Sequence, residues 1–598
     1  MDRLVKTVAI VGLSGLMVAC NSDDSGSSTP PKPVITSLTK AGDLTPGSIV
    51  KAISTCDDCS PENTKYTWVV EKEGAIDITE DKYFKVPDEI AGKTVRLIAK
   101  AHGSDTEEYV VFQRVTVDSI YQNDYSFVAL RDNGSIVAWG NNKYGGDIQV
   151  GSSGDFSSGI IDIISTPYAH AALKEDGSVM AWGWDYGGGD INMGSGGNLS
   201  SGIKKIFSTQ QAFAALRDDG SVISWGHPEI GNVNNGSGGD LSSGVIDIVY
   251  AWSAFAALKD DGSVVTWGFG YGADSSSCAN FLSSDITQVF GNTYAFAALK
   301  EDGSVCAWGD PRGGGDITVG SGGDLSSGVV NIIPGIMTFA AIKEDGSVVA
   351  WGNSRYGGDV TVGSGGDLSS GVKQVIPTTN GWAFSALKDD GSVIAWGSFT
   401  NGGDVNFGNK GDLSSGVDRV VAGTRAFAAI KKDGSVVTWG GLDTSVDPNN
   451  PDLNSGVIDV IPTNPSGHDG SAFTAIKKDG SIVAWGDESQ GGDITHGSGG
   501  DLSSGVSHIF ATSTAFSALK DDGSVVAWGN LERGGDTSYG SSGDLTAEVK
   551  QVYSNRNAFA ALKDDGQVIT WGNLETGGFS HHIESELQPH DIIIESSL

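Results

Sequence analysis

The sequence is poor in cysteine, histidine and positive charge. Its 598 residues include five Cys, nine His, and 38 Lys and Arg against 74 Asp and Glu, which gives a net charge of −36. Nucleic acids and anionic membrane surfaces bind basic patches, so this charge argues against both as partners. The same acidity keeps an exposed protein soluble.

Motifs of metal or nucleophilic catalysis are also missing. The nine His are scattered without zinc spacing, and no phosphate-binding loop precedes a helix. Carboxylates are so numerous that choosing two as a glycosidase acid and base would be arbitrary. The sequence therefore predicts no catalytic residue and favours a protein that is not an enzyme.

The N-terminus carries an apolar run that is too short for a spanning helix. Residues 4–19 are mostly apolar, and Arg3 and Lys6 supply the positive charge of a secretory signal. The segment LMVAC, residues 16–20, resembles a bacterial lipobox, which implies that residues 1–19 are removed and that Cys20 is lipidated. An ordinary signal peptide with a chance Cys is the alternative.

The residue after Cys20 is Asn21 rather than Asp, which resembles lipoproteins of the outer membrane. The implied location is the cell outer membrane, with the protein lipid-anchored and exposed outside or to the periplasm. Residues 20–34 are rich in Ser and Pro and form a polar, disordered tether. Which leaflet carries the anchor stays open.

Residues 35–117 form a separate small domain. Short apolar strands alternate with Gly, Pro and Asp turns, and Trp68 lies within one of them. This pattern predicts a small β-sandwich with Trp68 as its core aromatic residue. The segment resembles bacterial immunoglobulin-like spacer domains.

Residues 118–598 contain one unit repeated eleven times. A representative copy is residues 515–529, AFSALKDDGSVVAWG, and the Trp-Gly ends of the copies are spaced by 41 to 46 residues. Each copy reads as two strands joined by Asp-Gly or Asn-Gly, a dipeptide typical of tight hairpins. A third strand precedes the hairpin, and a short fourth strand is expected after it, as at residues 316–319 and 359–362.

Both faces of the hairpin carry apolar side chains, so it must be covered on both sides. Three or four strands per 43 residues with two covered faces predict a propeller blade between neighbouring blades. The blocks SGVxxI and AFAALKDDGSVVAWG and the Gly-rich exit resemble the regulator-of-chromosome-condensation repeat family, most closely its short-repeat secreted members such as the β-lactamase inhibitory protein propeller. That family is functionally diverse, so the resemblance implies a fold rather than an activity.

Eleven copies exceed the usual four to eight blades of a propeller. The even spacing favours a single large ring over seven plus four blades or an open array. The C-terminal segment His590–Ile594 resembles a first strand of the repeat. We expect it to close the ring by pairing into the first blade, where residues 115–121 compete for that role.

The copies differ from one another mainly at one edge. In an antiparallel meander, the loops before the hairpin and after Trp-Gly share one rim. Aromatic and Arg side chains gather in these loops and are typical anchors of recognition. The predicted ligand-binding residues are Tyr125, Tyr168, Trp184, Tyr186, Trp252, Tyr271, Tyr294, Arg355, Tyr356 and Trp382. The alternative is that they plug the centre or pack on adjacent loops.

Asp residues eight apart recur on the opposite rim. Asp is a hard oxygen ligand, and Ca²⁺ is therefore a chemically suitable cofactor there. The alternative is that each Asp caps a turn through backbone N–H groups. The candidate calcium ligands are Asp316, Asp324, Asp359 and Asp367; no other cofactor is expected.

Four cysteines remain after the lipobox. In an exported protein the pair Cys56 and Cys59 predicts a short-loop disulfide. Cys306 replaces a core Val, so Cys278 and Cys306 are either bonded or simply buried.

Taken together, these features favour a surface-anchored, non-enzymatic recognition or adhesion protein that binds a protein or glycan ligand at the cell exterior. A carbohydrate-active enzyme or lectin working at the propeller centre is the first alternative. An inhibitor of a secreted enzyme, by family analogy, is the second. The oligomeric state stays unknown.

Overall fold

The computed structural model describes residues 32–597 apart from 46–47, 58–62, 73–74, 88–92, 152–153, 195–196, 237, 321–322, 364–365, 409–410, 442–450, 464–470, 498 and 541–542. The chain divides into two compact units. One contains the residues up to Gln113 together with those from Ile593 onward, and the other is Arg114–Ile592. Within the described ranges no helix is long and apolar enough to cross a membrane.

The first unit consists of two sheets that enclose one core. The smaller sheet has the order β1-β2-β5 and the larger the order β4-β3-β6-β7-β41. Trp68 is fully buried between them and stacks on Phe84 at 5.2 Å, which confirms it as the core aromatic residue. The strands are β1 (Val34–Ala41), β2 (Ile49–Asp57), β3 (Thr64–Lys72), β4 (Ala75–Thr79), β5 (Tyr83–Lys85), β6 (Thr94–Ala101), β7 (Glu108–Val115) and β41 (His590–Ser596).

The second unit is built from eleven three-stranded antiparallel sheets within the described residues, one for each sequence repeat. Their strands are β8 (Val117–Gln122), β9 (Ser126–Arg131), β10 (Ile136–Gly140); β11 (Ile160–Thr166), β12 (Ala169–Lys174), β13 (Val179–Gly183); β14 (Ile203–Ser208), β15 (Ala212–Arg217), β16 (Val222–Gly226); β17 (Val245–Tyr250), β18 (Ala254–Lys259), β19 (Val264–Gly268); β20 (Ile286–Gly291), β21 (Ala295–Lys300), β22 (Val305–Gly309); β23 (Val329–Pro334), β24 (Thr338–Lys343), β25 (Val348–Gly352); β26 (Val372–Pro377), β27 (Ala383–Lys388), β28 (Val393–Gly397); β29 (Val417–Ala422), β30 (Ala426–Lys431), β31 (Val436–Gly440); β32 (Val457–Pro462), β33 (Ala472–Lys477), β34 (Ile482–Gly486); β35 (Val506–Ala511), β36 (Ala515–Lys520), β37 (Val525–Gly529); and β38 (Val549–Ser554), β39 (Ala558–Lys563), β40 (Val568–Gly572).

Short 3₁₀ helices occupy most of the loops that leave the third strands. They are η2 (Asn142–Tyr144), η3 (Asp185–Gly187), η4 (Tyr271–Ala273), η5 (Ser276–Cys278), η6 (Phe281–Ser283), η7 (Pro311–Gly313), η8 (Ser354–Tyr356), η9 (Phe399–Asn401), η10 (Pro451–Leu453), η11 (Glu488–Gln490), η12 (Leu531–Arg533), η13 (Leu574–Thr576) and η14 (His581–Glu586).

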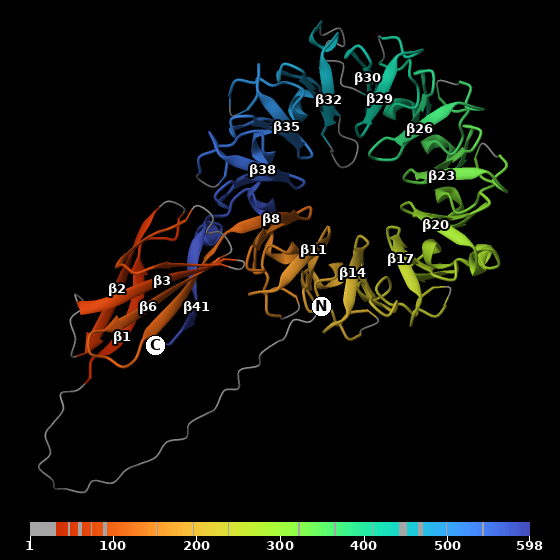
Figure 1. Ribbon diagram of the computed structural model, residues 1–598. Helices are drawn as coiled ribbons and strands as arrows, with labels where there is room; N and C mark the ends of the chain where they lie inside the picture. Colours follow the sequence, from red (N-terminus) through yellow and green to blue (C-terminus); the bar gives the residue numbers. More distant parts are fainter. Residues whose placement is uncertain are drawn as a thin grey trace, which may run out of the picture. The chain divides into compact units, whose positions relative to one another are not determined.

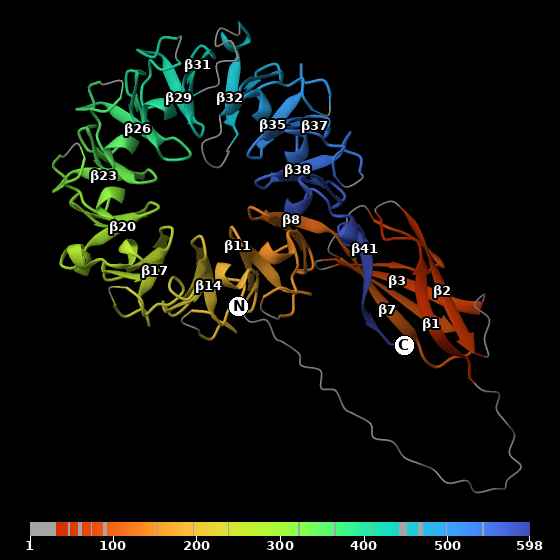
Figure 2. The ribbon, with the colours of Figure 1, turned by 180° about the vertical axis from the view of Figure 1, so that it is seen from behind.

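The eleven blades form one closed ring (Figures 1 and 2). The first strand of each blade contacts the first strand of the next, and β38 of the last blade contacts β8 of the first. Blades diverge with distance from the axis, so these first strands are the innermost. The structure confirms the single ring over a split or open array.

Each interface between blades is filled by the repeated Trp, which stacks on Phe in ten blades and on His170 in the second. In nine blades the indole N–H donates to a glycine carbonyl in the exit loop of the preceding blade. The bond from Trp139 to Gly577, at 3.0 Å, joins the first blade to the last by the same contact. Ring closure therefore needs no special device beyond the repeat itself.

Two sequence expectations about strands are wrong. The segment His590–Ile594 lies within β41, which pairs beside β7 in the five-stranded sheet and not in the first blade. The three strands of the first blade all come from its own repeat, so that blade offers no vacant place for β41.

The expected fourth strand is reduced to a single bridge residue, such as Gly320 opposite Trp351. The reason is a turn: the Asp316 carboxylate accepts the N–H of Thr318, and Gly320 has φ +125°. This conformation bends the chain away from an extended strand.

The cysteines are only partly accounted for. Cys278 and Cys306 form a disulfide between the exit loop of the fourth blade and β22 of the fifth. Cys56 is disulfide-bonded. Its predicted partner Cys59 lies outside the described residues, as does Cys20, so the short-loop pairing and the lipidation stay predictions.

Glycine precedes eight of the eleven first strands, and the exceptions allow a comparison of stability between blades. Gly505 has φ +73°, and an added Cβ would meet nothing closer than 3.6 Å, so backbone strain alone opposes a side chain there. Glu548 occupies the same repeat position with φ +64°. We expect Gly505→Ala to reduce the free energy of unfolding by about 1 kcal/mol. Glu548→Ala, measured by the same urea titration, should change it far less, and equal losses would contradict this explanation.

Candidate functional site

The two rims of the ring differ in composition because of the course of the chain. The turn between first and second strands and the loop after the third strand lie on one rim, here called the variable rim. The Asp-Gly turns lie on the other. All ten predicted ligand-binding residues belong to the variable-rim segments by their positions between the strands.

The backbone of the variable rim is held by one buried polar side chain in eight of the eleven blades, whereas Ala or Gly takes that position in the other three. In the first blade Asn123 Oδ1 accepts the N–H groups of Tyr125 and Ser126 at 2.9 and 2.8 Å, and its Nδ2 donates to the Tyr144 carbonyl at 2.8 Å. In the second blade the Thr166 hydroxyl donates to the Gly187 carbonyl at 2.9 Å. These bonds fix both loops of a blade to each other, so the neighbouring side chains can vary without loss of the turn.

Five aromatic rings of the first two blades form a continuous group, here called the Tyr–Trp cluster. Its members are Tyr125, Tyr144, Tyr168, Trp184 and Tyr186. Tyr125 stacks on Tyr168 at 5.8 Å between ring centroids, and Tyr168 meets Trp184 edge to face at 5.5 Å. Trp184 in turn lies 5.9 Å from Tyr186, whose side chain is 47% exposed.

Charged groups surround the Tyr–Trp cluster. The Lys143 ammonium lies over the rings of Tyr144 and Trp184, at 5.3 and 5.5 Å. Burial raises the pKa of Asp124, and the nearby Arg556 of the last blade acts in the opposite direction. Burial also raises the pKa of the Tyr168 hydroxyl. The cluster therefore presents neutral rings flanked by both signs of charge.

The other predicted residues do not join this cluster. Tyr356 stacks on Trp382 at 5.5 Å between the sixth and seventh blades, and Arg355 is exposed beside them. Trp252, Tyr271 and Tyr294 are exposed by 54%, 66% and 43%. The structure thus brings four of the ten residues together, pairs two others and leaves the remainder apart.

Sequence reasoning underestimated two members of the site. Tyr144 lies in the first exit loop, and only the packing shows that it bridges Tyr125 and Tyr168. Lys143 directly precedes Tyr144, and nothing in the sequence except its positive charge indicated that it belongs to the site. Comparing blades one and two as neighbours, rather than position by position, could have found Tyr144.

A buried polar pair lies beneath the Tyr–Trp cluster. Ser126 and His170 stand where other blades have mostly Ala and Phe, and both are fully buried. His170 Nε2 lies 2.9 Å from the Ser126 hydroxyl, and its Nδ1 lies 2.8 Å from the Ser165 hydroxyl. A substrate cannot reach this pair, so its Ser–His hydrogen bond serves packing.

The buried imidazole makes stability depend on pH. Burial lowers the pKa of His170 from 6.5 to about 3, so the folded chain holds it neutral while the unfolded chain protonates it below 6.5. A lowered His pKa means that stability is lost as pH falls below the unfolded value. Between pH 7 and 5 we expect a loss of about 2 kcal/mol in the free energy of unfolding.

The control for this pH effect is the double variant Ser126→Ala/His170→Phe, which restores the residues of the other blades. Its loss between pH 7 and 5, from urea titrations at each pH, should be smaller by about 2 kcal/mol. Equal pH profiles of the two proteins would refute this role of His170.

The calcium candidates are turn caps. Asp324 Oδ1 accepts the N–H of Ser326 and its hydroxyl, and Asp367 makes the same two bonds to Ser369. These bonds, the Ser hydroxyl first, lower the pKa of both carboxyl groups. Asp316 and Asp359 bond Thr318 and Thr361 in the same way. Within the described residues no group of three or more His, Cys, Asp or Glu could hold a metal ion.

No protein-family model matches the chain, and no curated protein matches it. Many solved structures are similar to it, and three serve as examples. The computationally designed Ika8 protein is 17% identical, with 54% of this chain and 96% of that chain covered and a TM-score of 0.25. Prp20p from Saccharomyces cerevisiae, in a study of its binding to Gsp1p and histones, is 15% identical over 55% and 94% of the chains, with a TM-score of 0.25.

Yeast RCC1 (Prp20) bound to Kap60 is 14% identical over 56% of this chain and 83% of that chain, with a TM-score of 0.26. These values are too low to say anything about partners. The assignment of fold therefore depends on the eleven sheets themselves: the chain is an all-β protein with a sandwich and a closed ring of eleven repeated blades.

Proposed function

We propose that this chain is a non-enzymatic recognition protein whose ring binds a partner protein through the Tyr–Trp cluster. The observation that carries the proposal is the cluster itself: five aromatic side chains from two blades touch one another on the rim that varies among repeats. Aromatic rings supply large contact areas with little loss of side-chain freedom on binding. Their backbone is already fixed by Asn123 and Thr166, which lowers the ordering that binding would require.

Surface anchoring is the second part of the proposal. The lipobox-like segment at residues 16–20 supports lipidation of Cys20 and retention at the outer membrane. The Cys20→Ser variant should move from the membrane fraction to the soluble fraction of the cell. Retention of that variant in the membrane fraction would argue against a lipid anchor.

The binding surface is tested with exposed side chains that folding does not need. The full chain, immobilised through its N-terminal region, is used to capture and identify extracellular proteins, and the affinity of a captured protein is then measured by calorimetry. Tyr186→Ala should weaken that affinity about tenfold or more, as for a central aromatic anchor. The matched control is Phe399→Ala, which removes an aromatic side chain that is 52% exposed and lies in η9 of the seventh blade, outside the first two blades. Equal effects of the two variants would exclude the Tyr–Trp cluster as the binding surface.

A further inference from the structure

A cavity of about 750 Å³ lies where six consecutive blades meet the centre of the ring. The turns between first and second strands of the second to seventh blades line it, from Ser165 to Gly381. Because the first strands are innermost, these turns form the mouth of the central channel on the variable rim. The volume is in the range of about 300–1,000 Å³ typical of small-molecule sites.

The cavity lining carries no charge. None of its 19 residues is Asp, Glu, Lys, Arg or His, in a chain of which 19% is Asp, Glu, Lys or Arg and whose net charge is −36. The lining instead combines hydroxyl and amide side chains, backbone of small residues, and a few rings. A charged ligand would find no partner there, and an anionic one would also be repelled by the surrounding protein.

Four residues that line the cavity, on three adjacent blades, have side chains available to a ligand. Tyr250 and Trp252 are exposed by 55% and 54%, far more than the repeated core aromatic residues. The side chains of Gln210, on the preceding blade, and Thr293, on the following blade, line the same cavity. In the described residues neither of these side chains has a hydrogen bond, whereas Asn292 and Thr378 use theirs to hold the turns.

We propose that this channel mouth binds a neutral oligosaccharide, with Trp252 as the stacking platform. Sugar rings present apolar C–H faces that stack on an indole, and hydroxyl groups that pair with amides and hydroxyls such as those of Gln210 and Thr293. The neutrality of the lining selects uncharged sugars over uronic or sulfated ones. The stacking platform Trp252 lies on the fourth blade and is not a member of the Tyr–Trp cluster of the first two blades, so this proposal does not depend on the proposed protein partner.

The probes are neutral hexasaccharides of glucose, xylose, mannose and N-acetylglucosamine, titrated into the full chain by calorimetry, with an oligogalacturonate as the anionic comparison. We expect at least one neutral hexasaccharide to bind, with an affinity that stays within twofold between 0.05 and 0.5 M NaCl. Trp252→Ala should weaken it at least tenfold and Gln210→Ala about fivefold. Phe399→Ala, whose ring is similarly exposed but does not line the cavity, should leave it unchanged.

The outcomes separate this site from the recognition of a protein. Absence of binding by all four neutral sugars would overturn the proposal, as would tighter binding of the oligogalacturonate. An affinity that Trp252→Ala leaves intact would also overturn it. If Tyr186→Ala abolishes protein capture while sugar binding persists, the two sites are independent. If no protein is captured but a neutral hexasaccharide binds, the proposed protein recognition fails and the channel-mouth site still holds.

Discussion

Replacing Trp351 by Ala should lower the free energy of unfolding by about 3–5 kcal/mol. The side chain is fully buried between the fifth and sixth blades, where it stacks on Phe339 at 5.3 Å. Its indole N–H donates to the Gly314 carbonyl of the fifth blade at 2.9 Å. Truncation therefore removes a large apolar contact and leaves a buried carbonyl without its donor. The loss is measured as a shift of the urea midpoint.

The repeat supplies a matched control that separates packing from hydrogen bonding. Trp267 is equally buried and stacks on Phe255 at 5.0 Å, but its indole N–H has no hydrogen-bond partner in the described part of the chain. Phe at either position keeps most of the apolar volume. Trp351→Phe should therefore destabilise by about 1–2 kcal/mol more than Trp267→Phe. If both variants lose the same stability, the inter-blade hydrogen bond contributes nothing measurable.

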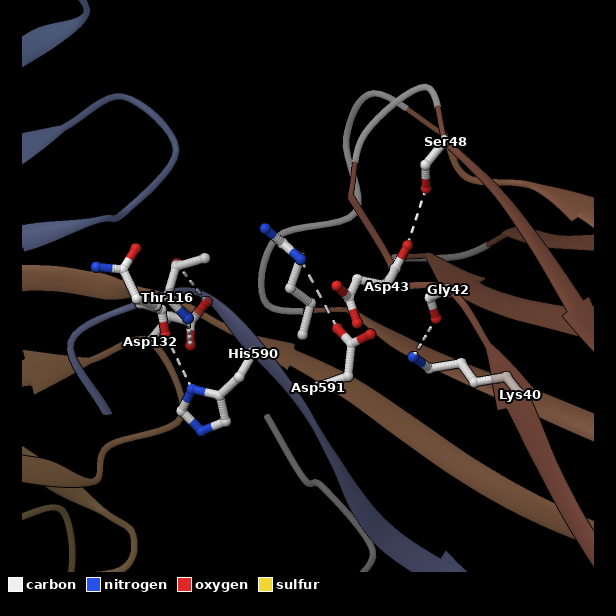
Figure 3. Close-up of polar contacts among 10 residues, drawn as sticks. Lys40, Gly42, Asp43, Ser48, Thr116, Asp132, His590 and Asp591 are labelled. Atoms are coloured by element: carbon white, nitrogen blue, oxygen red, sulfur yellow. Dashed lines mark hydrogen bonds and ion pairs between the residues drawn. The ribbon is translucent and has the colours of Figure 1, made fainter. Parts of the chain in front are cut away.

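Replacing Asp591 by Ala is the second change with a large expected effect. Asp591 and Arg114 form an ion pair at 3.8 Å with side-chain exposures of only 5% and 7%. Figure 3 shows the Asp591 carboxylate meeting this guanidinium, near His590 and the Thr116–Asp132 contact. Loss of the Asp591 carboxylate leaves the buried Arg114 charge without its ion-pair partner. Such changes lower the free energy of unfolding by about 3–5 kcal/mol.

Two comparisons test this explanation of the Asp591 effect by chemical denaturation. The double variant Arg114→Met/Asp591→Leu removes both charges and should regain most of the lost stability. Asp247→Ala breaks the exposed pair Lys205–Asp247, at 3.9 Å, and should change stability by less than about 1 kcal/mol. A double variant as unstable as Asp591→Ala would mean that shape, not charge, explains the loss.

The repeats made part of the candidate site predictable from the sequence but not all of it. Comparing the eleven copies identified the variable rim, because residues that the fold of the blade requires are nearly the same in every copy. Residues that the fold does not require differ from copy to copy. The comparison could not say which variable side chains meet. Tyr125 and Tyr168 are 43 residues apart and stack, whereas Trp252 and Tyr294 are equally aromatic but have no aromatic ring packed on them within the described residues. That distinction depends on rotamers and loop packing, which one blade's sequence does not contain.

The sequence by itself determined the blade and the number of repeats, and its even spacing favoured a single ring that the structure then confirmed. Alternation along the strands, the Asp-Gly turns and the Trp-Gly ends are local signals repeated at a nearly constant period, and closure uses the same contact as every other interface. Only the tertiary structure decided where β41 pairs, that the channel mouth is uncharged, and that His170 meets Ser126. These features arise from contacts between residues that are distant in the chain. The energies of such contacts depend on burial and on the geometry of the two residues, so they produce no periodic pattern in the sequence.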